Sequence, residues 1–237
     1  MVPPMNYHVG TSGFAYKEWK GAFYPKDLPA EQMLKFYGER FRAVEINNTF
    51  FRMPKPAVLE SWAADVPDGF KFVLKASRGI THMKRLKDAG DSVAYLLKVA
   101  SALKEKLGPL LFQLPPNMKK DLPRLREFLR LLPRDQRAAF EFRHQSWFED
   151  DELFALLREH QAALCIAEAE DDLQIPFTST ADWGYLRLRM PDYTDKDLKV
   201  WLKRVREQDW KDVFVFFKHE DQANGPRLAK RFIELAT

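Results

Sequence analysis

The fold can be worked out from one stretch of the chain, Asp91-Ser-Val-Ala-Tyr-Leu-Leu-Lys-Val-Ala-Ser-Ala-Leu-Lys-Glu-Lys-Leu-Gly-Pro-Leu-Leu-Phe-Gln-Leu114. In its first part, 91–107, apolar residues recur three and four positions apart, which is typical of a helix with one buried face. Its last part, 109–114, is a short apolar and aromatic run of the kind that forms a strand. The stretch therefore predicts a helix followed closely by a strand.

The same two patterns alternate along the whole chain. Further strand-like runs lie at 7–10, 43–47, 70–75, 139–142, 163–167, 183–189 and 213–218. Further helix-like segments lie at 28–41, 122–132, 152–159, 194–207 and 226–235. The intervals after the second and sixth strands are weaker, because the helical pattern at 56–62 is short and 168–182 has mostly the composition of a loop.

Eight strands that alternate with helices, at about 30 residues per unit, predict a TIM-type (β/α)8 barrel of the α/β class. An open doubly wound sheet alternates in the same way, but no glycine-rich dinucleotide fingerprint follows the first strand, and the strand count reaches eight. No linker-like segment divides the chain. We therefore expect a single barrel domain over residues 1–237, with the helix after strand six short or missing.

Composition excludes several classes of protein. With 46% hydrophobic and 30% charged residues among 237, the chain has the composition of a folded domain rather than of a disordered or fibrous one. No apolar run approaches the roughly 20 residues of a membrane helix, and Met1-Val-Pro-Pro-Met5 lacks the pattern of a signal peptide, so we expect a cytoplasmic protein without a membrane partner. The single cysteine, Cys165, excludes an internal disulfide.

Polar residues end or follow most of the predicted strands, which is where a barrel of this type carries its chemistry. In strands five and seven they alternate with large hydrophobic residues, so we expect the charged side chains to point into the barrel mouth. Ionised groups that converge there are costly unless they are paired or bind a ligand. The candidates for substrate binding at these strand ends are Thr11, Ser12, Asn47, Lys75, Arg78, Gln113, Arg143, His144, Tyr185, Arg187, Arg189 and Lys218.

Cations outnumber anions among these candidates, with six Lys or Arg side chains against Glu45 and Glu141. Because a guanidinium holds a carboxylate or a phosphate through two hydrogen bonds, this excess favours an anionic substrate. The turn Gly10-Thr-Ser-Gly13 could add backbone N–H groups for a phosphate, although a tight turn that needs glycine explains it equally well. The alternative for the whole cluster is an ion-pair network with a purely structural role.

Acid–base catalysis is expected from Glu45, Glu141, His82 and His219. Surrounding cations should keep both carboxylates ionised, which suits a base or an electrostatic stabiliser better than a general acid. An equally weighted alternative is that these carboxylates only position the arginines. The two histidines have the more suitable intrinsic pKa.

Two further expectations concern aromatic residues and metals. Trp19 and Trp147 are the loop aromatics expected to face a ligand, on which they could stack. We expect no metal ion, because the chain contains no HExxH motif, no CxxC pair and no EF-hand spacing. No cofactor is expected either.

Five segments occur in order over nearly the whole chain: Gly10-Thr-Ser-Gly-Phe-Ala-Tyr-Lys-Glu-Trp19, Val44-Glu-Ile-Asn-Asn-Thr-Phe-Phe-Arg52, Phe72-Val-Leu-Lys-Ala-Ser-Arg-Gly-Ile-Thr-His82, Leu107-Gly-Pro-Leu-Leu-Phe-Gln-Leu-Pro-Pro116 and Phe140-Glu-Phe-Arg-His-Gln-Ser-Trp147. Together they resemble the YecE-like family, domain of unknown function 72. The resemblance implies a TIM-type barrel and no particular reaction. The chain departs from many members after strands seven and eight, where Arg189-Met190 and Lys218-His-Glu-Asp221 make the mouth more charged.

Three hypotheses of function follow. The first is an enzyme, a hydrolase or an isomerase, that acts at the mouth on a small anion bearing phosphate or carboxylate, for example a sugar-like compound. The second is a barrel that binds nucleic acid or cleaves phosphodiesters. The third is a non-catalytic barrel that binds an anionic ligand.

Overall fold

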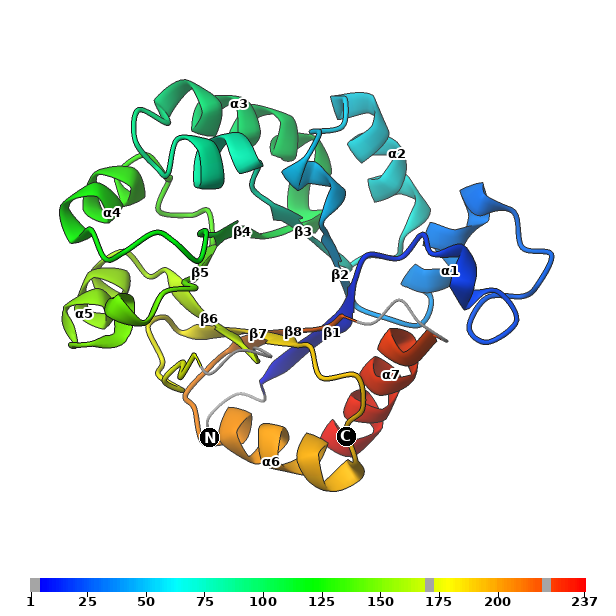
Figure 1. Cartoon of the computed structure of the whole chain (residues 1–237). Helices are drawn as coiled ribbons and strands as arrows, with labels where there is room; N and C mark the ends of the chain where they lie inside the picture. The colour runs from blue at the N-terminus through cyan, green and yellow to red at the C-terminus, as the bar shows by residue number, and fades with distance from the viewer. Residues whose placement is uncertain (1–4, 169–172, 219–222) are drawn as a thin grey trace.

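The computed structural model describes residues 5–168, 173–218 and 223–237. Eight parallel strands close into one barrel in chain order, with β8 paired to β1 (Figure 1). The strands are β1 (Asn6–Ser12), β2 (Ala43–Ile46), β3 (Lys71–Lys75), β4 (Leu107–Gln113), β5 (Ala138–Glu141), β6 (Ala163–Ala167), β7 (Trp183–Leu188) and β8 (Asp212–Phe217). This arrangement confirms the TIM-type barrel that the alternating sequence pattern predicts.

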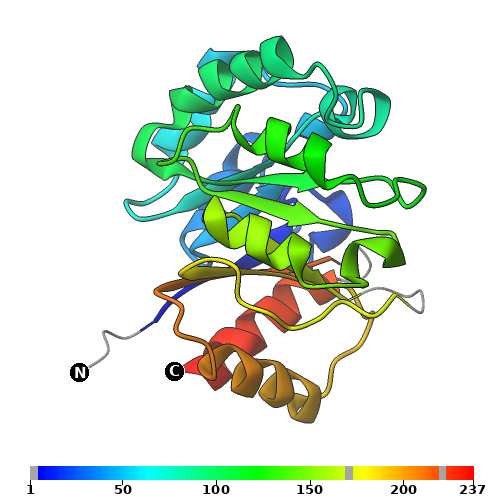
Figure 2. The same ribbon diagram turned by 90° about the vertical axis from the view of Figure 1, so that its left-hand side faces the viewer.

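Helices form a ring around the outside of the barrel, as Figure 1 shows along the barrel and Figure 2 from the side. They are α1 (Met33–Gly38), α2 (Pro56–Asp65), α3 (Gly90–Ala100), α4 (Leu122–Leu129), α5 (Glu152–Glu159), α6 (Asp195–Arg206) and α7 (Asn224–Ala236). In the described parts of the chain, no helix combines the length and the hydropathy needed to cross a membrane.

The connection between β6 and β7 behaves as its sequence predicts. Its described residues, 168 and 173–182, form no helix.

Two other connections differ from prediction. α2 reaches Asp65 and is longer than its short pattern suggests, since Pro56 begins it at a position where proline costs no hydrogen bond and Leu59 is fully buried. The helix predicted over 91–107 ends at Ala100 and continues as the 3-10 segment η5 (Ser101–Lys106), in which Lys104 has φ +50°.

The barrel interior is filled by side chains of complementary size. Small residues come mainly from β2, β5 and β6, and large aromatic residues come from β7 and β8. One buried cluster contains Ala43, Ala139, Ala163, Ala167, Trp183, Tyr185, Phe214 and Phe216. An eight-stranded barrel has just enough interior to be filled in this way, so the interior is a packed core.

The strand register brings polar residues to one end of the barrel. Ser12 is paired with Glu45, and Gln113 with Glu141. Ser12, Lys75, Gln113 and Glu141 are each the last residue of a strand. Because all eight strands are parallel, these side chains lie at the carboxyl end of the barrel, which is the mouth.

Candidate functional site

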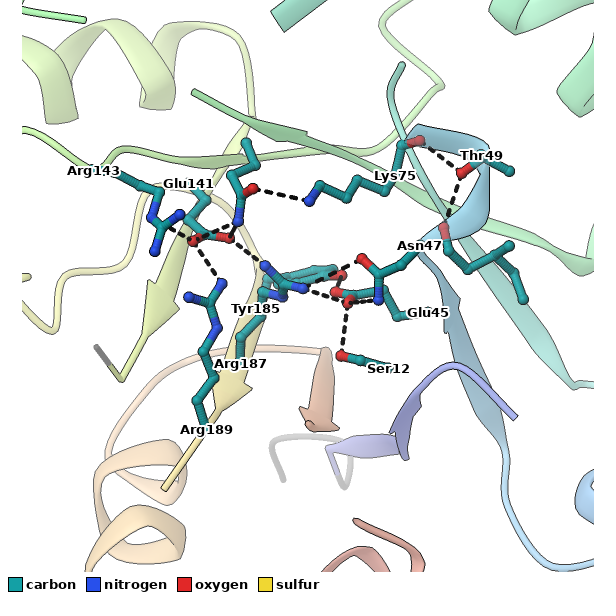
Figure 3. Close-up of polar contacts among 12 residues, drawn as sticks. Ser12, Glu45, Asn47, Thr49, Lys75, Glu141, Arg143, Tyr185, Arg187 and Arg189 are labelled. Carbon is teal, nitrogen blue, oxygen red and sulfur yellow. Dashed lines mark hydrogen bonds and ion pairs between the residues drawn. The ribbon is translucent and has the colours of Figure 1, made fainter. Parts of the chain in front are cut away.

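A buried arginine links two carboxylates across the mouth. Arg187 of β7 donates from Nη2 to Oε1 of Glu45 at 2.7 Å and from Nη1 to Oε2 of Glu141 at 2.6 Å (Figure 3). The three residues are between 0% and 2% exposed. Residues from β2, β5 and β7 are thus joined into one ion-paired unit, which we call the carboxylate–arginine cluster.

The carboxylate of Glu45 has a full set of donors. Besides Arg187, Oε1 accepts from the Ser12 hydroxyl at 2.7 Å and from Nδ2 of Asn47 at 3.1 Å. Oε2 accepts from the Tyr185 hydroxyl at 2.6 Å. Ser12, Asn47 and Tyr185 were predicted to bind substrate, but in this structure they hydrogen bond to Glu45.

The carboxylate of Glu141, like that of Glu45, accepts hydrogen bonds on both of its oxygens. Nε2 of Gln113 lies 2.9 Å from both of its oxygens, and Nη2 of Arg189 donates to Oε1 at 2.7 Å. Arg143 is more loosely placed, with Nε 3.7 Å from Oε1 and 30% of its side chain exposed. Within the described residues this contact is the only one within ion-pair distance for the Arg143 guanidinium, so its other N–H groups are open to a ligand.

The electrostatics of the cluster keep both carboxylates ionised. Burial alone would raise the pKa of Glu45, but the charge of Arg187 and the hydrogen bonds from Tyr185 and Ser12 outweigh it and lower the pKa. For Glu141, burial is likewise outweighed by Arg187 and Arg189, and its pKa lies below its usual range. Carboxylates with lowered pKa and saturated hydrogen bonds are poor proton acceptors. The geometry therefore favours the alternative in which they position the arginines.

Lys75 differs from the arginines in its partners. Its Nζ donates to Oε1 of Gln113 at 2.9 Å and lies 4.2 Å from the ring centroid of Phe50. No carboxylate oxygen of the described residues lies within ion-pair distance of it. Burial, reinforced by the charge of Arg187, lowers its pKa to about 8. A substantial fraction of this amine is therefore neutral at slightly alkaline pH.

His82 contacts the same aromatic ring as Lys75. It lies in the π-helical segment η4 (Gly79–Met83), and its ring meets that of Phe50 edge-on at 4.9 Å. Its Nδ1 is 2.9 Å from the Thr81 hydroxyl. Burial, followed by the charges of Lys75 and Arg143, lowers its pKa. The imidazole is therefore neutral at physiological pH and can accept a proton.

Five predicted site residues have other surroundings. Thr11 is 1% exposed, and both its backbone N–H and its hydroxyl are engaged with Tyr37, so this N–H is not free for a phosphate. Nδ1 of His144 accepts from the backbone N–H of Ser146. Arg78 and Lys218 are exposed. His219 lies outside the described residues.

The two tryptophans that were predicted to face a ligand, Trp19 and Trp147, are buried instead. Trp19 is 1% exposed and packs against the rings of Tyr16 and Tyr24, and Trp147 is fully buried with its indole N–H donated to the carbonyl of Met118. Neither ring has a free face for a ligand. Both residues lie in the core because an aromatic residue on a loop gains more from burial than from exposure at the rim.

Comparison with known proteins places this barrel among its relatives. A family model described as "Protein of unknown function DUF72" matches residues 8–237. The chain belongs to the DUF72 family. The UPF0759 protein YecE of Escherichia coli K12 is 33% identical over 120 residues, which cover 50% of this chain and 44% of YecE. The chain thus matches less than half of the length of that relative. The UPF0759 protein YunF of Bacillus subtilis 168 is 24% identical over 270 aligned residues, which cover 96% of this chain and 94% of YunF.

Solved DUF72 structures share the barrel. A DUF72 family protein from Thermotoga maritima MSB8 superposes with a TM-score of 0.84 at 27% identity, covering 97% of this chain and 98% of that one. A second, from Enterococcus faecalis V583, has a TM-score of 0.74 at 17% identity, covering 98% of both chains. The first likeness agrees with the family assignment, and the second shows the fold alone.

Sequence reasoning missed one residue of this DUF72 mouth. Phe50 ends the 3-10 segment η3 (Asn48–Phe50) after β2, and its ring contacts both the Lys75 amine and the His82 imidazole. Its position directly after a strand that carries Glu45 and Asn47 is the signal that could have marked it. Among the described residues, no group of three or more His, Cys, Asp or Glu side chains is placed to hold a metal ion.

Proposed function

We propose that this DUF72 barrel is an enzyme that binds a small anionic substrate at its mouth. The observation that carries the proposal is the excess of cations around a saturated pair of carboxylates. Four cations, Lys75, Arg143, Arg187 and Arg189, surround the carboxylates of Glu45 and Glu141, which leaves two positive charges uncompensated among these residues. A phosphate or carboxylate of the substrate would compensate them.

The residues of the mouth divide into two roles under this proposal. The carboxylate–arginine cluster is buried, and its Glu141 carboxylate accepts hydrogen bonds from Arg189 and Gln113 and so positions them. Arg143 and Lys75 have the free hydrogen-bonding capacity to contact an anion. His82, a neutral imidazole beside them, is the group suited to proton transfer.

Sulfate binding tests the proposal, because sulfate keeps its charge over the whole range of working pH. We expect sulfate to bind in a calorimetric titration at low salt and to stabilise the protein against heat. Arg143→Ala should weaken binding about tenfold or more, since a charged hydrogen bond is worth roughly 1.5–3 kcal/mol. Arg227→Ala on the outer helix α7 is the matched control and should bind as the parent does. Absence of binding, or equal losses in both variants, would contradict the proposal.

The two alternative hypotheses predict different binding behaviour. A nucleic-acid-binding barrel requires affinity for single- or double-stranded DNA or RNA that falls steeply with salt, and burial of Trp19 and Trp147 removes the stacking residues it relied on. A filter-binding titration at low salt tests it. A non-catalytic anion-binding barrel predicts that sulfate binds and that no small phosphate- or carboxylate-bearing compound is turned over.

A further inference from the structure

The surroundings of the Lys75 amine differ from those of the arginines at the mouth. It ends β3, and its Nζ is fixed by two contacts, the Gln113 side-chain oxygen at 2.9 Å and the Phe50 ring at 4.2 Å. The first contact uses one of the three ammonium protons and the second uses none. No carboxylate of the described residues pairs with it, although two lie deeper in the same mouth.

The surroundings of Lys75 favour the neutral amine. The side chain is partly buried, and the guanidiniums of Arg187 and Arg189 add positive charge nearby, so its pKa falls to about 8. The negative charges of Glu45 and Glu141 oppose this effect, but both carboxylates are already paired with those arginines. A desolvated lysine next to other cations is the arrangement that makes an amine reactive toward carbonyl groups.

We infer that Lys75 forms an imine with a small oxo acid, whose carboxylate or phosphate is held by Arg143 and whose carbonyl carbon faces the amine. This inference rests on the proposed anion site and names its substrate class. The ring of Phe50 contacts both Lys75 and His82 and gives the imine a partly apolar wall.

The bonds and protons of the step balance without an oxidant or a reductant. The nitrogen lone pair of the neutral amine attacks the carbonyl carbon, and one N–H proton passes to the carbonyl oxygen to give a carbinolamine. The hydroxyl group then leaves as water after it gains a proton, and the nitrogen forms the C=N bond as an iminium ion. His82 is the neighbouring imidazole that can carry these protons. An iminium ion then withdraws electrons from the carbon next to it, which suits isomerisation or carbon–carbon bond cleavage.

Reductive trapping tests the inference on the intact protein. Pyruvate is added at pH 8 with sodium borohydride, and the modified lysine is located by peptide mass spectrometry. At that pH the neutral fraction of Lys75 exceeds that of an ordinary lysine by roughly a hundredfold, so one adduct per chain at Lys75 is expected before other lysines react. Adducts distributed over surface lysines with none at Lys75 would overturn the inference.

Two lysines of the same strand provide the matched pair of variants. Lys75→Arg keeps the positive charge but cannot form an imine, so the adduct should disappear. Lys71→Arg, at the opposite end of β3, should leave labelling unchanged. An adduct of the same yield in Lys75→Arg would refute the role of Lys75. Methyl pyruvate, which keeps the activated carbonyl group but has no charge, should label Lys75 about tenfold less than pyruvate, the factor expected for one charged contact. Equal labelling by both would refute the assignment to oxo acids.

Sulfate binding separates the two proposals. Sulfate should bind the parent protein and Lys75→Arg alike at pH 7 and should compete with pyruvate labelling. If sulfate binds but pyruvate leaves no adduct, the imine is refuted and the anion site stands. If sulfate does not bind, the anion site itself is refuted.

Discussion

Arg187 is the residue on which the geometry of the mouth depends. It is 2% exposed and donates to carboxylates from two other strands. A buried guanidinium is tolerated only when its charge and its N–H groups are compensated. Burial tends to lower the pKa of Arg187, but the charges of Glu45 and Glu141 outweigh it and raise that pKa well above its ordinary value. Both carboxylates therefore compensate the buried charge of Arg187.

Replacing one of these carboxylates by its amide should destabilise the protein strongly. In Glu141→Gln the shape is retained but Arg187 and Arg189 lose a counter-charge, and we expect a loss of about 3–5 kcal/mol in the free energy of unfolding. Urea unfolding followed by circular dichroism measures it. Asp195→Asn, which breaks an exposed ion pair with Arg231, is the control and should change stability little. A small effect in both variants would show that the cluster is not important for stability.

The charge of Lys75 should make anion binding depend on pH. Because its pKa is about 8, the ammonium form is lost as the pH rises from 7 to 9, and sulfate affinity should fall about tenfold over this range. Isothermal titration at constant ionic strength measures it. In Lys75→Arg the charge persists, so the affinity should stay level from pH 7 to 9. The charged groups that face this amine are Glu45, Glu141, Arg187 and Arg189. An unchanged pH profile in Lys75→Arg would assign the effect to another group.

At the scale of elements, the sequence predicted the strands better than the directions of individual side chains. Burial of each strand leaves an apolar run that is visible in the sequence, and all eight runs became strands. The convergence of Glu45 and Arg187 followed from the barrel topology, although they are 142 residues apart. An ion-pair network was one of the alternatives drawn from the sequence, but the cation with which each carboxylate pairs could not be predicted, because that depends on rotamers. The prediction that Trp19 and Trp147 face a ligand was wrong for a similar reason, since a loop aromatic has the same sequence pattern whether it faces a ligand or the core.

β7 supplies Arg187, and a glycine of the same strand lies directly against a tryptophan ring. A Cβ atom at Gly184 would lie 2.3 Å from the ring of Trp210, which packs over the start of the strand. Gly184→Ala should therefore cost about 1–3 kcal/mol of stability by overpacking. Gly90→Ala, at the first residue of α3 with no atom within 4 Å of the added methyl group, should be neutral or slightly stabilising. Thermal unfolding of the two variants measures the difference, and equal melting temperatures would contradict this packing.

At the scale of the whole molecule, charged clusters lie at both ends of the barrel. The mouth contains the carboxylate–arginine cluster. At the opposite end, Asp212 of β8 is 2.7 Å from Arg137 and 3.1 Å from His8. Burial would raise the pKa of Asp212, but the hydrogen bonds from Arg137 and His8 outweigh it and lower the pKa. The barrel therefore has ionised groups on both sides of its apolar interior, and its stability must depend on pH at both ends.

Acid should destabilise the barrel in two stages. Burial lowers the pKa of His8 and His82 in the folded protein, so the unfolded chain takes up protons first and stability falls as the pH drops below about 6.5. The pKa values of Glu45, Glu141 and Asp212 are also lowered, so their stabilising contribution is complete above the ordinary carboxyl range near pH 4 and is lost as the pH falls through their folded values. Urea unfolding at pH 8 to 3 and constant ionic strength measures both stages. His8→Gln should reduce the first stage, to which His82 still contributes, and should leave the contribution of Glu45 and Glu141 to the second stage unchanged. A stability that is constant between pH 7 and 5 in the parent protein would show that these histidines are not buried as neutral groups.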